Sequence, residues 1–389
     1  MPDVFTRLAP EIQKIEAQLH AQPELSFEEH ATTRLIEEVL MNLPGFSRVE
    51  LGLTTGTVWR LTGTKAGPVV GLRADIDAIR QEEQVQRPDR SRRAGIMHAC
   101  GHDVHTAGLL GAAMALSEMR ESLCGDVVLI FQPAEEILQG AKKLIAHGLF
   151  EKAPLDMLFG LHNQPALPFG TVGIKEGPLM AGKDDFVLEL HGKGGHGGMP
   201  ESCTDPIVAA CSLVNALQTV VSRNVSPLDA AVLSVCSIHG GTEENLIVDN
   251  VRLTGSLRTM REAVRSRALE RLQAICETGA AAYECRAELR IMPLNGPVDN
   301  SKAMTAIAKR AAAAACGIEN LRAAQPSMGC EDFAAYAPYV PSFFYFLGSG
   351  EKEVDNPLWH KPDFRCAPGT AVMGAKLLTS SVLAAQGII

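Results

Sequence analysis

The sequence is short of aromatic residues, of basic charge and of long apolar runs, and these shortages exclude several classes of protein. Phe, Trp and Tyr make up 5% of the 389 residues, and the formal net charge at pH 7 is −9. Nucleic acids and anionic membranes bind basic surfaces, so we expect neither as a partner. No stretch approaches the ~18 apolar residues of a transmembrane helix, and no export signal is recognisable. We therefore expect neither membrane anchoring nor export.

The cysteines do not form the pattern of a disulfide framework. They contain no C-x-x-C pair and are scattered over positions 100, 124, 203, 211, 236, 276, 285, 316, 330 and 366. Disulfide-rich secreted domains are small and have closely spaced cysteines. A reducing compartment fits this chain better, and we predict a cytoplasmic protein.

Length and apolar periodicity predict two domains and an α/β fold. Apolar residues at helical spacing predict two opening helices, over about 5–19 and 31–40. Short apolar runs predict strands at 57–61, 69–73, 127–131 and 157–161, with helices near 103–118 and 136–147. This alternation is typical of a sheet with helices on its faces.

The middle of the chain predicts an inserted domain. Its expected order is strand, helix, strand, strand, helix, strand, which is the split βαβ arrangement of ferredoxin-like domains. The expected ranges are 186–190, 205–221, 231–238, 251–259, 261–282 and 287–292. Later apolar runs predict a strand at 343–347 and a helix from about 368. We predict one discontinuous domain over 1–182 and 296–389, interrupted by a second over 183–295.

Polar residues follow three of the predicted strands. Asp75 and Asp77 follow one, Gln132-Pro133-Ala134-Glu135-Glu136 follows the next, and His162 follows the third. In open α/β sheets, sites lie at the carboxyl ends of the strands. We expect these side chains to meet there.

Metal-ligand chemistry is concentrated in the segment MHACGHDVH at 97–105. In isolation, Cys100 and His102 are more often a buried thiol beside a hydrogen-bonded histidine. Glu135 and Glu136 are more often solvated helix surface, but here the pair follows a strand and a proline. Thiolate, imidazole and carboxylate are the ligands that zinc prefers. We therefore predict a metal site in which one glutamate is a ligand and the other a base.

Two further histidines enlarge this site. His162 in Leu-His-Asn and His360 in Trp-His-Lys-Pro are each more often structural when considered alone. Together with the residues above they exceed the ligands of one tetrahedral zinc, so two metal ions with a shared bridging group are expected. Asp77 is either a turn residue at a strand end or a carboxylate that orients a ligand histidine, and we favour the second.

Several long motifs resemble those of one enzyme family. They are GLRADIDA at 71–78, MHACGHDVHTA, FQPAEE, GKGGHGGMP, Gly240-Gly241-Thr242 with Asn245, and GCEDF at 329–333. In this order they resemble the dinuclear metal amidohydrolases: hippurate hydrolases, N-acyl-amino-acid amidohydrolases and indole-acetyl-amino-acid hydrolases, within the aminoacylase and carboxypeptidase G2 group. The resemblance spans nearly the whole chain. It implies a zinc-aminopeptidase-like catalytic domain with a mixed sheet, which hydrolyses N-acetyl, N-benzoyl or similar amino acids to a carboxylic acid and a free amino acid.

The resemblance also implies a ligand set for two divalent ions. Cys100 bridges them, His102 and Glu136 complete one, and His162 and His360 complete the other. Zinc suits these ligands, but manganese, cobalt or nickel could also occupy them.

Roles for five more residues follow from the resemblance. Glu135 is implied to be the general base and Asp77 the orienting carboxylate. The inserted domain is implied to form a homodimer, or a dimer of dimers, in which His196 reaches the partner's active site and stabilises the oxyanion. Asn245 and Arg258 resemble residues that bind the free carboxylate of the substrate. Without the resemblance, His196 would be a residue of a glycine-rich turn and Arg258 a surface cation.

The sequence departs from the family pattern at three places that bear on substrate preference. Arg80 replaces the usual proline and begins a highly charged loop over 80–95, Glu201 stands where histidine is common, and Leu246-Ile247-Val248-Asp249 replaces a segment with proline. None of these changes removes a ligand or the base.

Three alternatives remain open. An N-acetyl-diaminopimelate deacetylase, dipeptidase or carboxypeptidase of the same group would carry the same motifs. Gly192-x-Gly194-x-x-Gly197 formally matches a dinucleotide fingerprint, but Met199-Pro200 interrupts the expected helix start and no acidic residue follows at the required place. A non-catalytic metal-containing binding protein would keep the fold without the reaction.

Overall fold

The computed structural model describes residues 2–351 and 354–389, which form two compact units. The first unit comprises Met1–Leu179, Asp299–Gln325 and Ala335–Ile389, and the second comprises Met180–Val298 and Pro326–Ala334. Among the described residues, no helix has the length and apolar character needed to cross a bilayer.

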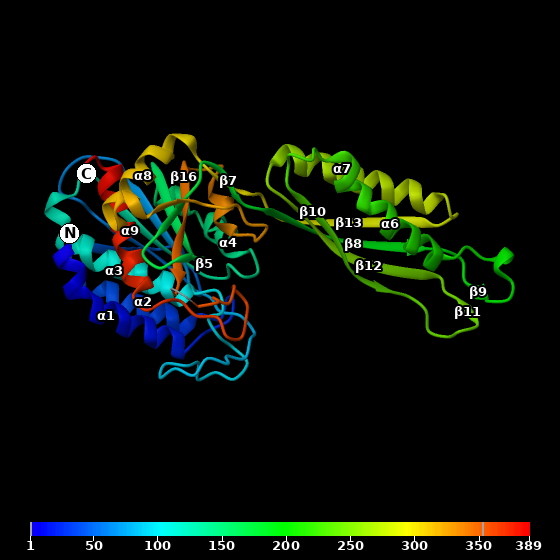
Figure 1. Ribbon diagram of the computed structural model, residues 1–389, viewed down its shortest axis with the longest axis horizontal. Coiled ribbons are helices and arrows are strands. Elements are labelled where there is room, and N and C mark those ends of the chain that lie inside the picture. Colours follow the sequence, from blue (N-terminus) through cyan, green and yellow to red (C-terminus); the bar gives the residue numbers. More distant parts are fainter. Residues whose placement is uncertain (1, 352–353) are drawn as a thin grey trace. The chain divides into compact units, whose positions relative to one another are not determined.

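The first unit is a mixed α/β fold built on an eight-stranded sheet (Figure 1). From edge to edge its strands are β1 (Phe46–Val49), β2 (Thr57–Leu61), β4 (Val127–Gln132), β3 (Val70–Asp75), β5 (Met157–Pro168), β16 (Ser342–Gly350), β6 (Val172–Ile174) and β15 (Leu321–Ala323). The four central strands β4, β3, β5 and β16 are parallel. The pairs β1–β2, β2–β4 and β16–β6 are antiparallel. The carboxyl ends of β3, β4 and β5 therefore lie side by side at the same end of the parallel strands.

Helix α3 (His102–Glu118) is the central helix of this unit. Every residue from His102 to Ser117 is buried, as expected of a helix that is apolar on all sides. It packs against α1 (Pro2–Ala21) and α9 (Thr370–Ala385), and α9 also packs against α8 (Lys302–Cys316). The remaining helices are α2 (His30–Met41), α4 (Gly140–Ala146) and α5 (Leu149–Lys152). Burial on all sides fixes the position of the amino end of α3.

The second unit contains an antiparallel four-stranded sheet and two helices. Along the chain the elements are β8 (Gly182–His191), α6 (Pro206–Asn224), β10 (Ala231–His239), β12 (Asn250–Thr259), α7 (Glu262–Ala281) and β13 (Arg286–Asn295). The strand order is β10-β12-β8-β13. Leu188, Leu213, Leu253 and Leu272 belong to its apolar core. The unit thus has a hydrophobic core of its own.

Small elements complete the described chain. Two-stranded sheets join β9 (Gly195–His196) to β11 (Leu246–Ile247) and β7 (Gly177–Met180) to β14 (Val298–Asn300). Short 3-10 helices are η1 (Arg120–Ser122), η2 (Pro200–Ser202), η3 (Ile318–Asn320) and η4 (Asp332–Tyr336).

One predicted helix begins later than expected. The sequence predicts a helix over 136–147, whereas α4 begins at Gly140. Ala134 and Leu138 both have φ of 54°, a left-handed conformation that an α-helix cannot contain. Residues 134–139 therefore form an irregular corner between β4 and α4.

Replacing a buried leucine of β4 tests the packing of the first unit. Leu129 is fully buried, so Leu129→Ala should lower the free energy of unfolding by about 2–5 kcal/mol. Ile318→Ala is the control, since Ile318 is 76% exposed and should change stability little. Both tryptophans, Trp59 and Trp359, belong to the first unit, so their fluorescence during urea unfolding reports this unit specifically. Equal effects of the two substitutions would contradict the described packing.

Candidate metal centre

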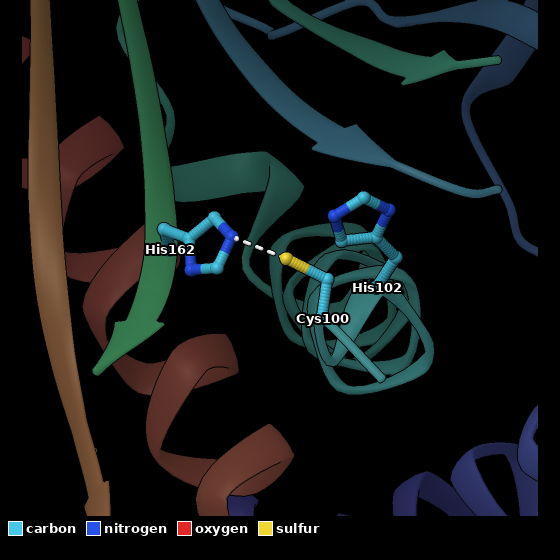
Figure 2. A group of neighbouring side chains, drawn as sticks. All are labelled: Cys100, His102 and His162. Carbon is cyan, nitrogen blue, oxygen red and sulfur yellow. Dashed lines mark hydrogen bonds between the residues drawn. The ribbon is translucent and has the colours of Figure 1, made fainter. Parts of the chain in front are cut away.

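Cys100, His102 and His162 lie close together near the carboxyl ends of the central strands. Cys100 precedes α3, His102 is the first residue of that helix, and His162 lies on β5. The Sγ atom of Cys100 is 3.3 Å from Nε2 of His162. Figure 2 shows the thiol directed at the His162 ring, with His102 beside it. Their ligand atoms lie within 4.8 Å of one another, which is close enough to share a cation.

Glu136 and His360 join Cys100 in a second group of the same kind. Glu136 lies in the corner after β4, and its Oε2 is 3.3 Å from Nε2 of His360. The backbone N–H of His360 donates to the carbonyl of Ala99 at 2.8 Å, which ties this late segment to the loop before α3. The His360 side chain is 53% exposed. Residues 100 and 360 therefore meet, as the sequence predicts.

Two polar atoms at this site are suited to a cation. Nε2 of His102 and Oε1 of Glu136 are buried, and neither has a hydrogen-bond partner within residues 2–351 and 354–389. They are 3.9 Å apart. A cation about 2 Å from each atom would satisfy both, because zinc–nitrogen and zinc–oxygen bonds have that length. The residues present thus fit divalent metal ions.

The carboxylate of Asp77 organises the residues around it. Its Oδ1 accepts from the backbone N–H of Glu135 at 3.1 Å, and its Oδ2 accepts from that of Glu136 at 3.0 Å. Ser26 donates its hydroxyl to Oδ2 at 2.7 Å. The Nδ1 atom of His102 lies 2.9 Å from the backbone carbonyl of Asp77 and 3.3 Å from Oδ1. Since a carbonyl oxygen only accepts, Nδ1 carries a proton, and Nε2 is the ring nitrogen that faces the site.

The backbone of the corner that carries the two glutamates adopts a conformation that is rare for residues other than glycine. Ala134 is left-handed, and its N–H donates to the buried carboxylate of Glu29 at 2.9 Å. At Gly140 a Cβ atom would lie 1.6 Å from the carbonyl oxygen of Pro133, so only glycine fits. His360 also has a positive φ, of 62°. Strained backbone of this kind is typical of functional sites, where surrounding bonds hold it in place.

Buried charges determine the protonation of the site. Burial lowers the pKa of His102, but the charge of Asp75 and the hydrogen bond to Asp77 outweigh it and raise the pKa to about 10. Burial holds the pKa of His162 well below its usual range. The Nδ1 of His162 donates to the carbonyl of Asn163 at 2.7 Å, which leaves Nε2 as the ligand atom. His162 is thus neutral and ready to bind a metal, whereas His102 must first lose a proton.

Four supporting residues were assigned no role from the sequence. Asp75 and His105 form a buried pair with 2.6 Å between Oδ1 and Nδ1. Asn163 contacts both Cys100 and His105, and Glu29 holds the corner at Ala134. The spacing of His102 and His105 by three residues places both on one face of α3 and could have indicated the second. No sequence pattern indicates Glu29, which lies more than a hundred residues from its partner.

The remaining predicted residues belong to the second unit. His196 is exposed on β9, where it pairs with Leu246, and the N–H of Gly197 donates to the carbonyl of Asn245 at 2.7 Å. His196 and Asn245 are therefore close together. Arg258 lies eight residues along β12 from Asn250, about 26 Å at the usual strand rise. Its guanidinium donates to the carbonyl of Met328 at 2.7 Å. Within one unit, Arg258 and Asn245 thus lie far apart.

Comparison with known proteins adds independent support for a metallohydrolase. Residues 71–384 match peptidase family M20/M25/M40. The chain is 42% identical over 350 residues to an N-acetylcysteine deacetylase of Bacillus subtilis, covering 89% of each protein. It is 38% identical over 372 residues to an IAA-amino acid hydrolase of Arabidopsis thaliana, covering 94% of this chain and 83% of the relative. A crystal structure of a Bacillus subtilis dinuclear metal binding peptidase from the M20 family superposes with a TM-score of 0.87 at 34% identity, covering 99% of both chains.

Metal affinity should rise with pH. At pH 6–8 His102 of the metal-free protein is protonated because its pKa is about 10, and binding through Nε2 must release that proton. Competition with a chelator should show affinity increasing roughly tenfold or more per pH unit, after correction for the chelator's own protonation. His239→Gln, a change at an exposed histidine, should keep the same slope. An affinity independent of pH would contradict the proton displacement.

Proposed function

This chain belongs to peptidase family M20/M25/M40, and we propose that it hydrolyses the amide bond of N-acyl amino acids with two divalent metal ions. The observation that carries the proposal is the convergence of ligand atoms around Cys100, with Glu135 beside them. Glu135 is buried, and a carboxylate oxygen of it lies within 4.8 Å of ligand atoms of His102 and Glu136. Such a set places a carboxylate beside metal ligands, which is the combination that metal-assisted hydrolysis with a general base requires.

In this proposal Cys100 is shared by both ions. His102 and Glu136 hold one ion, which is supported by Nε2 and Oε1, two buried atoms that make no hydrogen bond and lie 3.9 Å apart. His162 and His360 hold the other, and the 3.3 Å between the Cys100 thiol and His162 supports a shared ion there. When bound, the two ions would acidify water and polarise the amide carbonyl.

Glu135 is the proton-transfer residue. It takes a proton from the attacking water and later donates it to the departing amine, so that a carboxylic acid and a free amino acid are formed. The backbone N–H of Glu135 donates a hydrogen bond to Asp77, and this bond fixes the backbone from which the Glu135 side chain extends. The neighbouring N–H of Glu136 is held by the other oxygen of the same carboxylate. Two adjacent glutamates can thus serve different roles because one buried group fixes the backbone of both.

We further propose that the second unit is an inserted, ferredoxin-like dimerisation domain that supplies His196 to the partner's site. Its β-α-β-β-α-β order and its strand order support this assignment. The N–H of Gly198 donates to Nδ1 of His196 at 3.0 Å, so the neutral ring carries its proton on Nε2. This exposed N–H can donate to an oxyanion.

The separation of Asn245 from Arg258 supports the same arrangement. One substrate carboxylate cannot reach both residues within a single copy of this unit, because about 26 Å of strand separates Arg258 from Asn250, and Asn245 lies at the Asn250 end beside β9 and β11 (Figure 1). Two copies related by a twofold axis can bring opposite ends of the unit to one site. Asn245 then accompanies His196 into the partner's site, and Arg258 serves the site of its own chain.

The acyl group and the amino acid define the finer specificity. The relatives named above are an N-acetylcysteine deacetylase and an IAA-amino acid hydrolase, so their names specify different acyl groups. The departures at Arg80, Glu201 and Leu246 concern substrate preference, whereas the ligands and the base keep the family pattern.

Substitution of each glutamate should separate base from ligand. Glu135→Gln should keep both metal ions but lose at least ~10²-fold in kcat, since the proton-transfer group is gone. Glu136→Gln should bind metal more weakly, because a ligand is lost. Rates are measured on acetyl, benzoyl and indole-acetyl amino acids and on dipeptides, with metal content determined in parallel. Metal-loaded wild-type protein that cleaved none of them would contradict the proposed function.

Mixed dimers should test whether His196 acts across the interface. Glu135→Gln and His196→Ala should each be nearly inactive alone. In a mixed dimer, one of the two sites combines an intact Glu135 with an intact His196 from the partner, so random mixing should restore about a quarter of wild-type activity. Two Glu135→Gln preparations mixed together are the control. No recovery, with dimers verified by size, would show that His196 does not act across the interface.

A further inference from the structure

Asn163 is bonded to residues on both sides of the candidate metal centre. Its side-chain amide donates to the carbonyl of Cys100 at 2.5 Å. Its backbone carbonyl accepts from Nδ1 of His162 at 2.7 Å and from the indole N–H of Trp359 at 3.1 Å. The residue is fully buried. It therefore holds the backbone of one expected ligand and the ring of another.

A second group of buried residues holds Asn163 itself. Its backbone N–H donates to Nε2 of His105 at 2.9 Å. Because an N–H only donates, Nε2 of His105 is the acceptor and Nδ1 carries the proton, which it donates to Oδ1 of Asp75 at 2.6 Å. The other oxygen of Asp75 accepts from Arg73 at 2.7 Å. The chain of bonds runs from Arg73 through Asp75 and His105 to Asn163.

This chain of bonds supports ligands and is not itself a ligand set. Asp75, His102 and His105 lie close enough to hold an ion. However, both ring nitrogens of His105 are engaged, one by Asp75 and one by Asn163. A metal could bind there only by breaking one of these bonds. The pair Asp75–His105 is therefore better suited to fixing the position of Asn163.

Gly101 makes the close approach of Asn163 to Cys100 feasible. It has a φ of 83°, and a Cβ at this position would lie 2.4 Å from the Asn163 amide nitrogen. Any other residue at position 101 would push the amide away from the Cys100 carbonyl. Glycine at position 101 therefore leaves room for the hydrogen bond from Asn163 to the Cys100 carbonyl.

We propose that Asn163, held by His105 and Asp75, is a positioning residue that sets the separation of Cys100 and His162 and thereby the affinity for the ion these two residues share. The inference rests on the proposed dinuclear function. Asn163 touches neither substrate nor reacting atoms and acts through the two ligands. Without its side chain, the Cys100 backbone loses its bond to β5, while His102 and Glu136 keep theirs to Asp77.

Metal titration of an isosteric variant tests this role. Asn163→Asp keeps the volume but lacks the amide N–H groups, which donate to the Cys100 carbonyl and whose nitrogen lies 3.0 Å from Nε2 of His105. We expect the ion shared by Cys100 and His162 to bind about 10–100-fold more weakly, the usual effect of losing a partner of a ligand. The other ion also uses Cys100 but keeps His102 and Glu136, so its affinity should fall less. Cobalt substitution gives a second readout, because the thiolate-to-cobalt absorption reports the geometry at Cys100. Asn163→Ala removes the same donors without adding a buried carboxylate and should give the same result.

The matched control is Asn300→Asp. Asn300 is another buried asparagine, whose amide donates to the carbonyls of Lys175 and Phe344 at 2.9 Å. Its substitution should lower stability but leave both metal affinities and the cobalt spectrum unchanged. Two ions bound to the Asn163 variants with wild-type affinity would overturn this inference. Fewer than two ions on the wild-type protein would instead contradict the proposed function, so the two failures are distinguishable.

Discussion

The carboxylate of Asp77 is the group on which the geometry of the centre depends. It is buried, and its two oxygens face the N–H groups of Glu135 and Glu136, the hydroxyl of Ser26 and the ring of His102. Burial raises the pKa of Asp77, but the hydrogen bond and charge of His102 outweigh it and lower the pKa, so the group stays ionised. A neutral acid would lose acceptor strength towards all of these donors at once.

The arrangement supports the different roles proposed for two adjacent glutamates. Glu135 and Glu136 are identical in type and neighbours in sequence, so only their directions can distinguish them. A corner with left-handed residues at positions 134 and 138 sets those directions, and Glu29, Asp77 and Gly140 hold the corner. The backbone strain in this segment is offset by charge-assisted hydrogen bonds that exist only when the first unit is folded.

Sequence patterns predicted the helices and strands but not the hydrogen bonds that connect them. The run at 57–61 matches β2, and helices and strands of the second unit begin and end within a few residues of expectation. The approach of His360 to Cys100 was also predicted, since the chemistry of the ligands requires it. The helix expected from residue 136 was placed too early, because apolar spacing cannot reveal a left-handed Leu138. Contacts such as Asn163 with Cys100 depend on the relative position of a loop and a strand. This position cannot be derived from the pattern of one sequence.

The exposure of His360 has a consequence for how the protein handles metal over time. This ligand is about half exposed, while the atoms of His102 and His162 are buried. An ion held partly by an exposed side chain can exchange with the surrounding solution by rotation of that side chain alone. An ion held by His102 and Glu136 can leave only after buried groups move apart. If His162 and His360 hold one ion and His102 and Glu136 the other, as proposed above, the two ions would differ in residence time, and scarcity of metal in the environment would empty one position while the other stays filled.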